Sequence, residues 1–264
     1  MDQASGWNDA TAAIAEAEAG GAVLGVSALF PGGRRFSHNG GRRFIAASTV
    51  KIAIMIELFR QVDAGRLSLD TAHRLRPQDK ASGSGVVAKL HDGIELTLGD
   101  LAYLMMSISD NSSTNMLIDQ VGQDRVNATM RSLGLAESVL GRRMRGAHVD
   151  PGEQENWAVP DEYVRMVGSL FDGSAASAPS CARMLALLED QQNDRRIARH
   201  LPGTNRPRWG TKTGSLPGVA NDVGFVMTAQ GPVILAVFCA NLSDPNEGER
   251  IIGDVARALW SAPA

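Results

Sequence analysis

The sequence predicts a mixed α/β fold of the α+β type, in which one antiparallel sheet is built from both chain ends and a helical lobe is inserted between them. Three observations lead to this prediction. Strand-like stretches occur within residues 22–45 and return within residues 208–240. Helical patterns fill the interval between them. One more helical pattern lies at each end of the chain, so we expect terminal helices to flank the sheet.

The N-terminal elements alternate with glycine-rich turns. A helix is expected at residues 7–19, followed by strands at residues 22–30, 34–39 and 42–45. The turns between these strands contain Pro31-Gly32-Gly33 and Gly40-Gly41, residue types that favour tight turns. This part of the chain is therefore expected to supply the first strands of the sheet.

Helices dominate the middle of the chain. They are expected at residues 49–64, 98–108, 115–121, 125–133, 161–171 and 179–190. Gly65, Gly122 and Gly134 each follow one of these helices, where a helix C-terminus favours glycine. Thr97, with Asp100 three residues later, is typical of a capping box at a helix start.

The C-terminal part of the chain returns to strands, at residues 208–214, 222–229 and 233–240, and closes with a helix at residues 247–260. We expect two lobes in one compact unit. Residues 1–47 and 196–264 would form the α/β lobe, and residues 48–195 the helical lobe. The cleft between two such lobes is the natural place for an active site.

Composition excludes several classes of protein. The chain has 264 residues, 44% of them hydrophobic, and a net charge of −3, which gives no electrostatic reason to expect nucleic acid or a membrane as partner. The apolar run at residues 233–240 is too short to span a bilayer. Cys181 and Cys239 are expected to be free core thiols rather than a disulfide framework.

The N-terminal residues 1–20 lack a basic segment followed by an apolar stretch, so no export signal is recognised there. The sequence as it stands therefore predicts a cytoplasmic protein. A periplasmic or secreted location is expected instead if the N-terminus has been trimmed.

Ser48 and Lys51 form the first chemical motif. Ser48 lies where strand-like sequence gives way to a hydrophobic helix, and Lys51 falls one turn later on the same face. A serine hydroxyl is a weak nucleophile, and a lysine amine accepts its proton only if burial or another cation keeps the amine neutral. The alternative interpretation of this short motif is a helix cap beside a solvated lysine.

Two further motifs follow. Ser109-Asp110-Asn111 lies in a tight turn between two expected helices, where a cluster of N-cap residues is the alternative interpretation. Lys212-Thr213-Gly214-Ser215 lies on a strand before a Pro-Gly turn, where Gly214 lets a substrate approach the backbone closely and an ordinary edge strand is the alternative. Because all three motifs occur together in this order, the alternative interpretation of each single motif is rejected.

With its S-x-x-K, S-D-N and K-T-G motifs, the sequence resembles the class A β-lactamases and the related penicillin-binding proteins over nearly its whole length. The resemblance implies that Ser48 attacks an activated carbonyl, Lys51 relays its proton, and Ser109 passes the proton to the leaving nitrogen. The implied substrate-binding residues are Asn111, Lys212, Thr213, Gly214 and Ser215. Backbone N–H groups of Ser48 and Ser215 would form the oxyanion hole, and Asp110 would cap the following helix.

The sequence departs from this family in a loop. A class A β-lactamase needs a loop glutamate to activate the deacylating water, and that position falls here at Met144 or Arg145, neither of which is a base. Substitutes lie a few residues downstream and comprise Asp150, Glu153, Glu155 and His148. We expect Arg142 to form an ion pair within the loop.

A second departure concerns the substrate carboxylate. Ala220 and Asn221 occupy a region where relatives often carry an arginine, so carboxylate recognition is expected to depend mainly on Lys212. The sequence thus indicates a serine hydrolase that acts on β-lactams or small esters and amides through an acyl-enzyme. A penicillin-binding or sensor module that stays acylated, and a cytoplasmic esterase or transacylase, are the alternatives.

Cofactors and macromolecular partners are not indicated. The five histidines show no metal-ligand spacing and no H-E-x-x-H motif occurs, so we expect neither metal nor cofactor. The expected partner is a small-molecule substrate, bound by a monomer.

Overall fold

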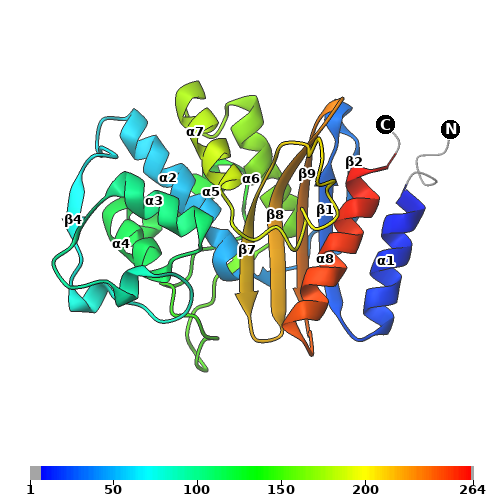
Figure 1. Cartoon of the computed structure of the whole chain (residues 1–264), viewed down its shortest axis with the longest axis horizontal. Coiled ribbons are helices and arrows are strands. Elements are labelled where there is room, and N and C mark those ends of the chain that lie inside the picture. The colour runs from blue at the N-terminus through cyan, green and yellow to red at the C-terminus, as the bar shows by residue number, and fades with distance from the viewer. Residues whose placement is uncertain (1–6, 263–264) are drawn as a thin grey trace.

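A five-stranded antiparallel sheet forms the centre of the computed structural model, which describes residues 7–262 (Figure 1). Its strand order is β2-β1-β9-β8-β7. The strands are β1 (Val23–Leu29), β2 (Arg35–His38), β7 (Trp209–Leu216), β8 (Val219–Thr228) and β9 (Gly231–Ala240). Both parts of the chain therefore contribute to one sheet, and the predicted fold class is confirmed. Residues 1–6 and 263–264, which belong to the predicted α/β lobe and include part of the stretch without a recognised export signal, lie outside the described residues.

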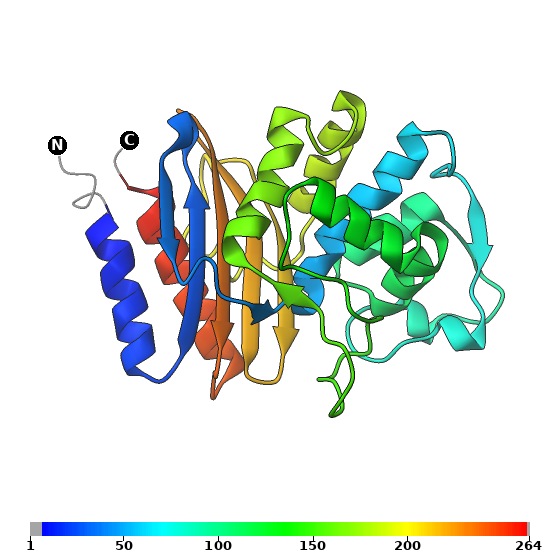
Figure 2. The same cartoon turned by 180° about the vertical axis from the view of Figure 1, so that it is seen from behind.

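Helices cover both faces of the sheet (Figure 2). The terminal helices α1 (Asn8–Ala19) and α8 (Pro245–Trp260) pack side by side on one face, as predicted. On the other face α6 (Pro160–Asp172) contacts β1, β8 and β9, while α7 (Ala178–Glu189) contacts β7. Helices α6 and α7 thus link the sheet to the helical part of the molecule. The division into two lobes at residues 47 and 196 stays a prediction.

Strand β9 shows why the centre of the sheet is continuously apolar. Leu235, Val237 and Cys239 pack against the terminal helices, whereas Ile234, Ala236 and Phe238 join the core that extends into the helical lobe. Alternate residues of a strand point to opposite faces, and both faces are covered here. Cys239 and Cys181 are both buried free thiols, which confirms the prediction made for them.

Beside the sheet lie the helices α2 (Lys51–Asp63), α3 (Leu98–Ser107), α4 (Asn111–Val121) and α5 (Gln123–Ser132), which belong with α6 and α7 to the predicted helical lobe. Two small two-stranded sheets accompany them. They pair β3 (Phe44–Ile45) with β6 (Trp157–Ala158), and β4 (Ala72–Arg74) with β5 (Glu95–Thr97). The predicted capping box starts α3, because the Thr97 hydroxyl accepts from the Asp100 backbone N–H and the Asp100 carboxylate accepts from the Thr97 N–H.

Most boundaries differ from the predicted ones by one to three residues, and three differences affect the site. The strand predicted at residues 42–45 shortens to β3 and pairs with β6, because here the chain leaves the main sheet for the helical lobe. Helix α4 starts at Asn111, four residues earlier than predicted, because Asp110 caps it. The helix predicted from residue 49 is preceded by a 3₁₀ turn at Ala47–Val50, which contains Ser48. Between residues 7 and 262, no helix is long and apolar enough to cross a membrane.

Candidate active site

Ser48 lies on a strained turn rather than at a helix cap. The preceding Ala47 has φ 47°, a left-handed conformation that costs free energy for a residue with a Cβ atom. Neighbouring contacts hold the turn, because Asn221 Nδ2 donates to the carbonyls of Ile45 at 2.8 Å and Ala46 at 3.2 Å. Ser48 makes no capping hydrogen bond, so the interpretation of the motif as a simple cap is wrong.

Lys51 is fully buried and points to the turn between α3 and α4. Its Nζ donates to the Ser109 carbonyl at 2.7 Å, to Ser109 Oγ at 3.1 Å and to Asn111 Oδ1 at 2.9 Å. Burial, with help from the positive charge of Lys212, lowers the pKa of Lys51 well below its ordinary value. The alternative of a solvated lysine is therefore wrong. The direct contacts of Nζ are to Ser109 and Asn111, not to the hydroxyl of Ser48.

The turn that carries Ser109 is fixed by the buried Asp110. Ser109 has φ 60°, and the Asp110 carboxylate accepts from the N–H groups of Ser113, Val86 and Val87 at 2.6–2.8 Å. Asp110 thus caps α4 and also fastens the loop before α3, in agreement with its predicted capping role. Asn111 joins the two loops, since its Nδ2 donates to the Ser82 carbonyl at 2.8 Å.

Strand β7 forms the opposite wall of the site. Lys212 on this strand is fully buried and its Nζ donates to the Thr213 carbonyl at 3.0 Å. Burial lowers the pKa of Lys212 to about 7 although the nearby Asp222 carboxylate opposes the shift. A Cβ atom on Gly214 would lie 2.9 Å from the Ala46 carbonyl oxygen and 3.1 Å from the Ser48 nitrogen, so only glycine lets β7 approach the nucleophile turn this closely.

Arg196 is a site residue that the sequence did not indicate. It is almost completely buried, its Nη1 donates to the carbonyls of Gly214 and Asn221 at 2.8 and 2.7 Å, and its Nη2 donates to Ser215 Oγ at 2.6 Å. Asp222 lies beside it, where burial raises the pKa of the carboxyl to about 6. The expectation that Lys212 is the main cation at this end of the cleft is therefore incomplete, because Arg196 brings a second one.

The loop between α5 and α6 contains the predicted ion pair. Arg142 Nε lies 3.0 Å and Nη2 3.1 Å from the two oxygens of the buried Glu155 carboxylate. Met144 is held at its backbone by Asn115, which accepts from the Met144 N–H at 2.8 Å and donates to the Met144 carbonyl at 2.9 Å. The Met144 side chain is buried. One of the two positions expected for a glutamate thus carries a buried thioether.

The predicted substitutes for that glutamate are engaged elsewhere. Glu155 pairs with Arg142, Glu153 and Asp150 pair with Arg145, and His148 Nε2 lies 2.8 Å from the Pro217 carbonyl oxygen. Between Ser48 and this loop lies a cavity of about 260 Å³. Over residues 7–262, it is lined by no aspartate, glutamate or histidine. The structure therefore brings the predicted site residues together, while the cavity between Ser48 and the loop has no carboxylate in its lining.

This fold, with its cleft between sheet and helices, places the protein among the serine hydrolases of the class A β-lactamase and penicillin-binding-protein superfamily. The chain belongs to the β-lactamase enzyme family, whose model matches residues 8–262. A β-lactamase crystal structure from Sphaerobacter thermophilus has 55% sequence identity and a TM-score of 0.94, with 96% of each chain covered. β-Lactamase BRO-1 of Moraxella catarrhalis is 25% identical over 87% of this chain and 73% of its own length. β-Lactamase SME-1 of Serratia marcescens is 25% identical over 90% of this chain and 83% of its own length.

Proposed function

We propose that the protein forms an acyl-enzyme at Ser48 with β-lactams, or with small esters and amides, and releases the acyl group slowly. The observation that carries this proposal is the environment of Lys51. A fully buried amine that contacts Ser109 and Asn111, with the cation of Lys212 nearby, has a lowered pKa, which favours the neutral form that a base requires.

Acylation is proposed to proceed in three proton and bond steps. Lys51 Nζ donates three hydrogen bonds, but a neutral amine has only two N–H groups, so one of these hydrogen bonds is lost on deprotonation. The lone pair that this exposes on Nζ takes the Ser48 proton. Ser48 Oγ then bonds to the carbonyl carbon, while the backbone N–H groups of Ser48 and Ser215 stabilise the oxyanion. The bond between the carbonyl carbon and the nitrogen then breaks, while Ser109 gives its proton to that leaving nitrogen and regains one from Lys51.

Substrate binding is assigned to the β7 wall and to Asn111. Lys212, Thr213 and Arg196 would attract a substrate carboxylate, with Gly214 allowing close approach of the substrate to the strand. Asn111 keeps one Nδ2 hydrogen for a substrate amide beyond its bond to Ser82. Deacylation would be slow because the cavity on the Met144 side offers no carboxylate to activate water.

Intact-protein mass spectrometry during incubation with a penicillin tests this proposal. We expect an adduct of one penicillin mass that persists well beyond mixing. Ser48→Ala should abolish it, whereas Ser68→Ala, at an exposed serine remote from the cleft, should not. An adduct in the Ser48→Ala protein, or full activity of that variant on any substrate that the enzyme turns over, would exclude Ser48 as the nucleophile.

A transacylase is the second candidate, favoured by a polar cavity of about 530 Å³ on the Ser109 side of Ser48. By microscopic reversibility, an amine entering on that side gives its proton to Ser109 and needs no base near Met144. Added amines should then shorten the lifetime of the adduct. A penicillin-binding or sensor module would keep its adduct under all these conditions. Absence of any β-lactam adduct, together with a burst on an activated ester, would support an esterase.

Assembly stays a prediction of the proposal. A monomer acting on a small molecule is expected, and native mass spectrometry tests this expectation.

A further inference from the structure

Ser48 lies between two cavities of unequal size. The smaller, of about 260 Å³, extends toward Asn111, Met144 and Arg145. The larger, of about 530 Å³, extends toward Ser109 and the polar side chains of Gln191, Gln192, Asn193, Asp194 and Arg195. Both cavities share the residues around the nucleophile, so a substrate bound to Ser48 occupies both.

The positions of the reacting groups assign one part of the substrate to each cavity, and this step rests on the proposed function. Ser109 gives its proton to the leaving atom, so the leaving part of the substrate lies in the larger cavity, which Ser109 lines. The acyl part, which stays bonded to Ser48, lies in the smaller cavity. The smaller cavity therefore limits the size of the acyl substituent, whereas the larger cavity does not limit that of the leaving group.

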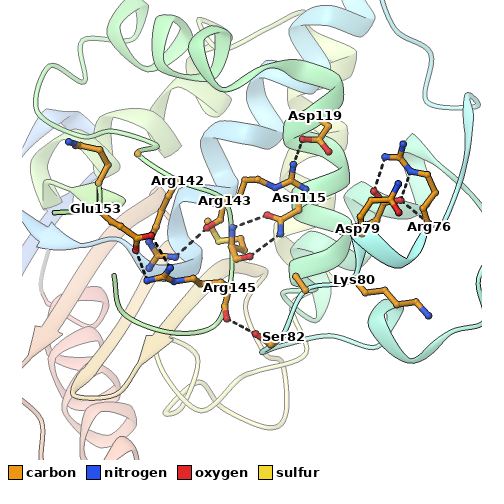
Figure 3. A pocket seen from close by; sticks show the side chains of 15 residues that line it. Arg76, Asp79, Lys80, Ser82, Asn115, Asp119, Arg142, Arg143, Arg145 and Glu153 are labelled. Atoms are coloured by element: carbon orange, nitrogen blue, oxygen red, sulfur yellow. Dashed lines mark hydrogen bonds and ion pairs between the residues drawn. The ribbon is translucent and has the colours of Figure 1, made fainter. Parts of the chain in front are cut away.

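A third cavity, of about 800 Å³, lies on the other side of the same loop, next to α4 (Figure 3). Each of its five lining cations has an ion-pair partner within the protein: Arg76 with Asp79, Lys80 with Asp92, Arg142 with Glu155, Arg143 with Asp119, and Arg145 with Glu153. The rear cavity is consequently polar without a strong excess of charge, and can accommodate a neutral polar or aromatic substituent.

Three residues line both the smaller cavity and the rear cavity: Arg142, Met144 and Arg145. Arg142 and Arg145 are held in ion pairs with Glu155 and Glu153, so Met144 is the uncharged side chain of the three. Its backbone is fixed from α4 by the two hydrogen bonds to Asn115. Beside it, Gly83 and Gly146 face each other so closely that a Cβ atom on Gly146 would lie 2.7 Å from the Gly83 Cα. The backbone on both sides is therefore held in place, which leaves the buried Met144 side chain as the uncharged group shared by the two cavities.

We propose that the Met144 side chain is a specificity-determining partition, which restricts Ser48 to acyl groups with compact substituents and closes the rear cavity to them. An unbranched thioether suits this place because it fills an irregular gap between two cavities. Shortening the side chain connects the cavities, and a bulky substituent then extends from the acyl carbonyl into the rear cavity.

Two penicillins that share one ring system and differ only in the acyl substituent, acetamido against naphthylamido, provide the test. The readout is the second-order rate of adduct formation, followed by intact mass. In Met144→Ala, we expect the ratio of the naphthyl to the acetamido rate to rise at least about tenfold, the scale set by a one-carbon change in a close-fitting pocket. Met130→Ala, which removes an equally buried methionine from α5, should leave the ratio unchanged.

A second pair of substrates probes the opposite cavity. Two cephalosporins that differ only in a substituent on the leaving side should acylate the unaltered protein at similar rates, and Met144→Ala should not alter their ratio. Thermal melts confirm folding, and Met144→Val replaces the alanine variant if that variant does not fold. An unchanged penicillin ratio in the folded variant overturns the partition. Failure of the unaltered protein to react with the acetamido compound instead contradicts the proposed function itself.

Discussion

The two sides of Ser48 differ in the environment of their charged groups. On the side of Ser109 and β7, charged groups are buried together, and burial shifts the pKa values of Lys51, Lys212 and Asp222 toward neutrality. On the side of the loop, Arg142 and Glu155 form an ordinary ion pair and Met144 fills the space next to the nucleophile. Buried groups with shifted pKa values are typical of sites of reaction chemistry, whereas an ion pair such as that of Arg142 and Glu155 stabilises a loop.

Under the proposed function, this difference teaches that acylation and deacylation depend on separate structural features. The proposed acylation residues are held by α2, β7 and the turn between α3 and α4, where Lys51 and Lys212 are fully buried. The water-activating group of the family would come from the loop alone. Replacement of one loop residue can therefore remove hydrolysis and leave bond formation at Ser48 intact.

The largest expected effect comes from supplying the missing base. Met144→Glu places a carboxylate on a backbone already fixed by Asn115, next to the Ser48 cavity. General-base catalysis is worth about 10²- to 10⁴-fold, so the lifetime of the penicillin adduct should shorten by about that factor. Met144→Gln has nearly the same shape and no basic carboxylate, and should keep the long lifetime. Equal lifetimes in both variants would show that the loop does not limit deacylation.

The next effect concerns Arg196 and the substrate carboxylate. Removing Arg196 alone would leave the buried Asp222 without the stronger of its two cations, so the substitution is made as Arg196→Met with Asp222→Asn. A charge-assisted contact is worth about 1.5–3 kcal/mol, or roughly 10- to 100-fold. The acylation rate of a penicillin should fall by that factor, whereas that of its methyl ester should barely change. An equal loss for acid and ester would indicate structural damage in place of lost carboxylate binding.

A smaller effect is expected from pH. Lys51 must lose its proton to act as a base, so acylation rises as pH increases through its lowered pKa. Lys212 must keep its proton to attract a carboxylate, and that charge is lost as pH increases through about 7. The preference for penicillin over its methyl ester should therefore fall about tenfold from about pH 6 to about pH 9, with Arg196 retaining the remainder. Stopped-flow rates for both substrates measure this ratio, and a constant ratio would exclude titration of Lys212.

The sequence predicts the sheet and the reacting side chains better than it predicts their surroundings. Strand and helix patterns are local, so the sheet built from both chain ends and the capping box at Thr97 could be anticipated. Arg196 could not, because it lies in an irregular segment and its contacts to Gly214 and Ser215 arise only in the folded chain. The spacing along the chain predicts that Met144 or Arg145 occupies the loop position. The separation of two cavities by Met144 depends on contacts with α4 that arise only in the folded chain.

The smallest expected effect tests the loop side directly. Glu153 and His148 are two of the loop groups predicted as substitute bases, yet Glu153 pairs with Arg145 and His148 contacts the Pro217 carbonyl. Backbone and Arg145 contacts also lower the pKa of Glu153, which makes it a weaker base. Glu153→Gln and His148→Asn should therefore leave the adduct lifetime unchanged in the time-resolved mass measurement. A markedly longer lifetime in either variant would mean that the loop rearranges after acylation and that its carboxylate or imidazole does reach the ester.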